Sequence, residues 1–169
     1  MRDYAEAART FDHDQAVVAA LHGNLEALNA CVECCDRHAG DGKLALIHED
    51  RDGNSARYSF DQLQVQAARF ANVLKAQGVG AGDRVAGLMP RTPELLVTIL
   101  ATWRLGAVYQ PLFTAFGPKA IEHRLEQSHA RVIVTDSHNR AKLDDVHACP
   151  TIITAVSYTH LTLPTTPYV

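Results

Sequence analysis

Three side chains near the start of the chain have the types and spacing of metal ligands. Cys31, Cys34 and His38 fall within the segment CVECCDRH, and on a helix they project near one face. Thiolate and imidazole groups are the ligands that zinc prefers. A closed zinc site needs a fourth ligand, however, and Cys149 stands far down the chain. The favoured interpretation is reduced, half-buried thiols on a helix, with a metal site as the alternative.

A glycine-rich segment, GVGAGDR at residues 78–84, is a second candidate for chemistry. Glycine-rich turns cradle phosphates in dinucleotide-binding proteins, where the turn follows a strand and opens a helix. Here the three glycines follow a helical pattern and precede a strand-like run. They are therefore predicted to form a tight helix-to-strand turn.

The elements that would position a site are clearest in residues 84–118. A β-rich run, an apolar helical run and a second β-rich run follow one another, at 84–89, 95–103 and 107–112. Thr92 offers an N-cap hydroxyl, and Pro93 occupies the first helical position, where no N–H is needed. This order predicts one βαβ unit with two parallel strands.

The rest of the chain continues the alternation of helical and strand-like patterns. Helices are predicted over 1–22, 24–38, 59–78 and 139–146 and from Gly117 onward, and strands over 44–49, 57–60, 131–135 and 151–156. The first two strands form a hairpin around residues 50–54. Ser59 and Gln62 form a capping box, and the helix they open places five apolar residues on one face, Leu63, Ala67, Phe70, Ala71 and Leu74. The predicted fold class is α/β, a mostly parallel sheet with flanking helices, preceded by helices and a β-hairpin.

Composition argues against two kinds of partner. The 169 residues carry a net charge of −3 with no cluster of lysine and arginine, so nucleic acid binding is not indicated. The longest apolar run, 95–103, is far shorter than the ~20 residues that span a bilayer, so no membrane partner is expected. No secretory or transit signal is visible at the N-terminus, which favours a cytoplasmic protein.

The last residues differ from the rest. VSYTHLTLPTTPYV, at 156–169, is rich in Thr, Leu and Pro, and its only ionisable side chain besides tyrosine is His160. It resembles translated adaptor sequence and is interpreted as a non-native tail, with a native loop or strand as the alternative.

Residues 25–150 resemble the N-terminal portion of the AMP-forming acyl-CoA synthetases, which belong to the adenylate-forming superfamily. The most specific pieces are GVGAGDR, WRLGAVYQP at 103–111 and FTAFGP at 113–118. With the RL at 124–125, the last piece is most similar to acetyl-CoA and other short- or medium-chain acyl-CoA synthetases. The resemblance divides the chain into a lead-in helix (1–24), a partial AMP-binding domain (25–155) and the tail (156–169).

The resemblance implies a two-step reaction. A carboxylic acid and ATP with Mg²⁺ form an acyl-adenylate, and the thiol of CoA then displaces AMP. Family members hold the triphosphate with a glycine-rich loop, but no glycine follows Gly117 in this chain. The chain is therefore expected to be an N-terminal fragment that is inactive alone, with no catalytic residue and no metal ligand assigned in it.

One binding element is implied within the chain. In acetyl-CoA synthetase-like members, the positions of Phe113, Thr114 and Arg140 contribute to the site for the nucleotide end of CoA. An aromatic face suits adenine and a guanidinium suits phosphate. The alternatives are that Phe113 fills the core and Arg140 is a solvated surface charge, and Lys142 is a weaker candidate.

Two other functions remain open at this point. The chain could belong to an adenylation domain that loads a carrier protein, or it could be a non-enzymatic α/β binding module with a metal at CVECCDRH. Neither the acid substrate nor the oligomeric state can be read from these residues.

Overall fold

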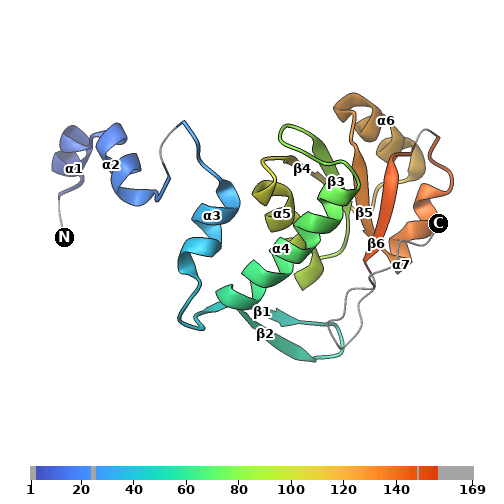
Figure 1. Ribbon diagram of the computed structural model, residues 1–169, viewed down its shortest axis with the longest axis horizontal. Coiled ribbons are helices and arrows are strands. Elements are labelled where there is room, and N and C mark those ends of the chain that lie inside the picture. The colour runs from blue at the N-terminus through green and yellow to red at the C-terminus, as the bar shows by residue number, and fades with distance from the viewer. Residues whose placement is uncertain (1–2, 24–25, 148, 156–169) are drawn as a thin grey trace.

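A parallel four-stranded sheet forms the centre of the molecule (Figure 1). The computed structural model describes residues 3–23, 26–147 and 149–155. The strands lie in the order β4-β3-β5-β6, and they span Arg84–Leu88 (β3), Val108–Leu112 (β4), Val132–Asp136 (β5) and Thr151–Ala155 (β6). This arrangement confirms the predicted α/β class.

Helices cover both faces of the sheet. On one face, α4 (Phe60–Ala76) and α5 (Pro93–Arg104) pack over Val85 and Val132. On the other, α6 (Pro118–Ser128) and the residues after β5 pack over Ala86 and Ile133. Successive strand residues point to opposite faces, so one short strand serves both cores. After β5 the chain forms α7 (Ser137–Arg140) and the 3-10 turn η2 (Ala141–Leu143), in place of the single helix predicted over 139–146.

The long helix α4 begins as the sequence predicts. The hydroxyl of Ser59 accepts from the amide of Gln62 at 3.2 Å, and the side chain of Gln62 accepts from the amide of Ser59 at 2.8 Å. This capping box satisfies amides that have no partner within the helix. The five apolar residues predicted to share a face are the five that α4 buries.

The βαβ unit is also confirmed, with one correction. β3 and β4 are parallel, with Arg84 opposite Val108, and α5 begins at Pro93. Thr92 occupies the N-cap position, but its hydroxyl makes no capping hydrogen bond. Its main-chain carbonyl accepts from the amide of Leu95 at 3.1 Å instead.

The glycines before β3 form the predicted turn. Gly78 and Gly82 have φ angles of 81° and 80°, which favour glycine. The amide of Gly80 donates to the carboxylate of Asp83 at 2.8 Å, and that of Gly82 to the carbonyl of Gly106 at 3.0 Å. Both amides already have acceptors within the protein, so they do not form a phosphate cradle.

The predicted hairpin pairs β1 (Leu44–Glu49) with β2 (Ser55–Ser59) in antiparallel order. Asp50 organises its turn. Its carboxylate accepts from the side chain and amide of Asn54 and from the amide of Asp52, at 2.8–2.9 Å. These hydrogen bonds, that of the Asn54 side chain first, hold the pKa of Asp50 below its usual value.

The N-terminal region differs most from the prediction. The helix predicted over 1–22 is two helices, α1 (Tyr4–Thr10) and α2 (His13–Ala20), because the side chain of Asp12 caps a new start. Neither buries a residue, and both lie apart from the sheet (Figure 1).

The next helix begins later than predicted. Its predicted cap, Asn24, lies outside the described residues, as does the tail 156–169. Helix α3 spans Ala30–Cys34 with Asn29 as its cap and is followed by the 3-10 turn η1 (Asp36–His38). None of the helices that the structure describes is long and apolar enough to cross a membrane.

Candidate functional site

The carboxyl ends of three strands meet at one edge of the sheet. Because β3, β4 and β5 are parallel, the turns after them open on the same side. The chain passes from β3 to β4 and then crosses to β5 on the other side of β3, a reversal that leaves a crevice outside the strand ends. A pocket of about 450 Å³ lies at this edge, lined by Arg51, Pro90, Thr114, Asp136, His138, Asn139 and Lys142.

The turn after β4 presents an aromatic ring to solvent. Phe113 is 70% exposed. Its ring centroid lies 5.5 Å from that of Phe116 with an angle of 83° between the rings, an edge-to-face pair. The amide of Phe116 donates to the carbonyl of Phe113 at 3.0 Å, which closes the turn. The exposure of Phe113 excludes the interpretation that it fills the core.

A polar network joins this turn to the segment after β5. The carboxylate of Asp136 accepts from the amide and the side chain of Asn139, each at 2.8 Å. The buried Asn139 in turn accepts from the ammonium of Lys142 at 3.0 Å. The same ammonium donates to the carbonyl of Thr114. Thr114 and Lys142 therefore line the pocket as connected groups.

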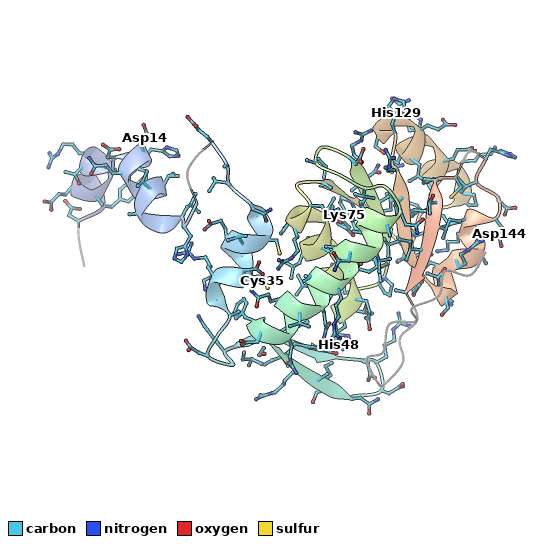
Figure 2. All side chains as sticks on the ribbon, viewed as in Figure 1. Asp14, Cys35, His48, Lys75, His129 and Asp144 are labelled. Atoms are coloured by element: carbon cyan, nitrogen blue, oxygen red, sulfur yellow. The ribbon has the colours of Figure 1, made fainter. Side chains whose placement is uncertain are left out.

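Arg140 lies on the short helix α7, directly after Asn139 of this network. Its guanidinium pairs with the carboxylate of Asp144 at 2.5 Å, and the two side chains are 40% and 64% exposed. Asp144 stands at the outer margin of the molecule in Figure 2. An exposed ion pair of this kind is weak, so a phosphate can compete for the guanidinium.

The pocket includes only one of the three residues named from the resemblance. Thr114 lines it, whereas Phe113 and Arg140 do not. Their binding roles therefore stay predictions. Lys142, the weaker candidate from the sequence, lines the pocket. Asp136 and Asn139 line it too, although the sequence analysis did not single them out; the available signal was the N-cap position of Asp136 directly after a strand.

The cysteine cluster is a packing feature of the N-terminal helices. Cys31 and Cys35 are buried, whereas Cys34 is exposed. Cys35 lies between α3 and α4 in Figure 2, with its thiol 3.8 Å from the carbonyl of Phe60. His38 packs against the ring of Phe60 at 5.0 Å between centroids. Within the described residues, no three groups of metal-ligating type come together.

Burial dominates the chemistry of the two inner thiols. It raises the pKa of Cys31 and of Cys35 to about 11. Neither thiol is therefore a thiolate near neutral pH. Beside them, Arg104 donates to both oxygens of Asp36 at 2.5 and 2.7 Å, which ties η1 to α5.

Comparison with known proteins decides the family. The family model described as "AMP-binding enzyme" matches residues 33–166. This chain belongs to the AMP-binding enzyme family. Among curated AMP-binding enzymes, it is 38% identical over 139 residues to an acetyl-coenzyme A synthetase of Bacillus subtilis, covering 80% of this chain and 24% of that protein. It is 45% identical over 112 residues to the acetyl-coenzyme A synthetase of Sodalis glossinidius, covering 64% of this chain and 17% of that protein.

Solved AMP-binding enzymes share the fold. An acyl-CoA synthetase from Brucella canis superposes with a TM-score of 0.89 at 47% identity, over 97% of this chain and 30% of that one. ATP-bound MatB from Rhodopseudomonas palustris gives a TM-score of 0.65 at 32% identity, over 76% of this chain and 25% of that one. The resemblance to acyl-CoA synthetases is thus confirmed. The chain spans less than a third of the length of each of these relatives.

Proposed function

We propose that this chain is the N-terminal part of an enzyme that joins a short- or medium-chain carboxylic acid to CoA. The acid first attacks the α-phosphorus of ATP and releases pyrophosphate, and the thiol of CoA then displaces AMP. The similarity to acetyl-CoA synthetases supports the reaction class. The solved relative described as ATP-bound supports the use of ATP.

The observation that carries the proposal is the exposed ring of Phe113 on a turn held against the segment after β5, which carries Arg140 and Lys142. CoA ends in an adenosine whose ribose carries phosphates, so this nucleotide needs an aromatic face for the adenine and positive charge for the phosphates. Phe113 supplies the face, and Arg140 and Lys142, which follow β5, supply the charge. These residues fit the nucleotide end of CoA.

The triphosphate of ATP and its Mg²⁺ are proposed to bind elsewhere in the longer enzyme. Residues 118–169 contain no glycine, so they lack the flexible backbone of a phosphate-binding loop. We therefore propose that the 169-residue chain is inactive by itself.

The test compares the 169-residue chain with its full-length parent. Acid-dependent exchange of pyrophosphate into ATP is measured for straight-chain acids from acetate to octanoate, and thioester formation is then measured with CoA. The parent is expected to catalyse both steps and the chain neither. Exchange by the chain alone, or a parent that acylates a carrier protein but not CoA, would contradict the proposal.

A further inference from the structure

The exposed ring of Phe113 is held in one orientation by a neighbour. A side chain that is 70% exposed normally samples several rotamers in solution. Here the edge-to-face contact with Phe116, at 5.5 Å and 83°, and the hydrogen bond that closes the turn restrict it. The orientation of Phe113 therefore depends on the orientation of Phe116.

Phe116 is fixed in turn by Arg124 of α6. The guanidinium carbon of Arg124 lies 4.1 Å from the centre of the Phe116 ring, a cation–π contact. The guanidinium also donates to the carbonyl of Ala120 at 2.9 Å, which keeps it above the ring. Phe116 also packs against the apolar core between α6 and the sheet.

Arg124 is itself anchored to the strand that precedes the turn. Its carbonyl accepts from the side chain of Gln110 on β4 at 3.0 Å. The hydroxyl of Ser128, at the end of α6, donates to the same Gln110 side chain at 2.8 Å. Helix α6 is thus locked to β4, and the Arg124–Phe116–Phe113 stack is built on a rigid base.

We propose that Phe116 and Arg124 are positioning residues for the CoA step. They hold the ring of Phe113 in the orientation that stacks on the adenine of CoA, without touching CoA themselves. This inference rests on the proposed function. The stack is proposed to serve CoA alone, and the triphosphate of ATP is proposed to bind elsewhere in the longer enzyme. The two residues are therefore expected to affect the thioester step and to leave acyl-adenylate formation unchanged.

The experiment uses the full-length parent with Phe116→Leu and Arg124→Gln. Each variant is expected to raise the KM for CoA about three- to tenfold, with kcat within about twofold, because a tenfold loss corresponds to about 1.4 kcal/mol of binding. Pyrophosphate exchange should match the wild type. With pantetheine, a thiol that lacks the adenine, the variants should also match the wild type.

Two further variants sharpen the result. Arg124→Lys keeps the cation above the ring and should recover part of the lost affinity. Arg131→Gln is the matched control, since Arg131 is a half-exposed arginine whose partner, Asp83, precedes β3 at the opposite edge of the sheet. Its KM for CoA should be unchanged.

The outcomes separate this inference from the proposed function. If Phe113→Ala raises the KM for CoA but Phe116→Leu and Arg124→Gln do not, the positioning role is wrong and the CoA site stands. If Phe113→Ala has no effect either, the CoA site itself is wrong. Loss of pyrophosphate exchange in Arg124→Gln, or an equal loss with pantetheine, means a general structural role and overturns the inference.

Discussion

The ammonium group of Lys142 donates a hydrogen bond to the main-chain carbonyl of Thr114, across 28 residues of sequence. The two residues follow strands that are not neighbours, because β3 lies between β4 and β5. Lys142 also donates to the buried Asn139 at 3.0 Å. It therefore holds the turn after β4 against the segment after β5.

Replacing Lys142 by methionine in the full-length parent should weaken CoA binding. The substitution keeps the aliphatic stem but removes a charge-assisted hydrogen bond worth about 1.5 kcal/mol and one cation beside the proposed nucleotide site. We expect the KM for CoA to rise about tenfold. Lys119→Met, at an exposed position on α6, is the control. An unchanged KM for CoA in Lys142→Met would show that the connection plays no part in binding.

A methyl group at Gly87 should destabilise the sheet. A Cβ there would lie 2.2 Å from the hydroxyl oxygen and 2.8 Å from two ring carbons of Tyr109, which crosses β3 from β4. Gly87→Ala should therefore lower the free energy of unfolding of the chain by about 1–3 kcal/mol in urea titrations. Gly80→Ala, whose Cβ would meet only Asp83 at 3.9 Å, should change it by much less. Equal stability of the two variants would refute the close approach of Tyr109.

The buried thiols should make the chain less stable in alkali. Burial raises the pKa of Cys31 and Cys35 to about 11, from the ordinary value of 9.0. As the pH rises, the thiols of the unfolded chain ionise at a lower pH than the buried thiols of the folded chain, and this favours the unfolded state. The stability of the folded chain is therefore unaffected below pH 9 and falls as the pH rises from 9 toward 11. The free energy of unfolding should fall by up to about 1.4 kcal/mol per pH unit for each thiol.

Urea titrations at pH 8, 9 and 10 measure this slope. Cys35→Ala should make the decline shallower, whereas Cys34→Ala should leave it unchanged because Cys34 is exposed. Identical slopes in the wild type and in Cys35→Ala would mean that Cys35 is not buried as a neutral thiol.

Local patterns made much of the fold predictable. The capping box at Ser59 and Gln62 and the buried face of α4 depend on residues within a few turns of one another, so the sequence displays them directly. The N-terminal region was predicted less well. There, Asp12 and Asn29 act as caps that the apolar periodicity does not reveal.

The site was predictable only in part, for a topological reason. The contact of Lys142 with Thr114 requires β3 to lie between β4 and β5, and strand order is not written in local periodicity. Local periodicity also does not show that Arg51, in the turn of the β1–β2 hairpin, lines the pocket. Resemblance to a family supplied Phe113, Thr114 and Arg140, whereas only the folded chain connects Thr114 to Lys142.

The most direct test of the account is the KM for CoA of the full-length parent carrying Phe113→Ala, measured beside pyrophosphate exchange by the same variant. Base–aromatic stacking contributes about 1–3 kcal/mol, so the KM for CoA should rise about five- to hundredfold while exchange is unchanged. A KM for CoA equal to that of the wild type would contradict the proposal that this turn binds the nucleotide end of CoA.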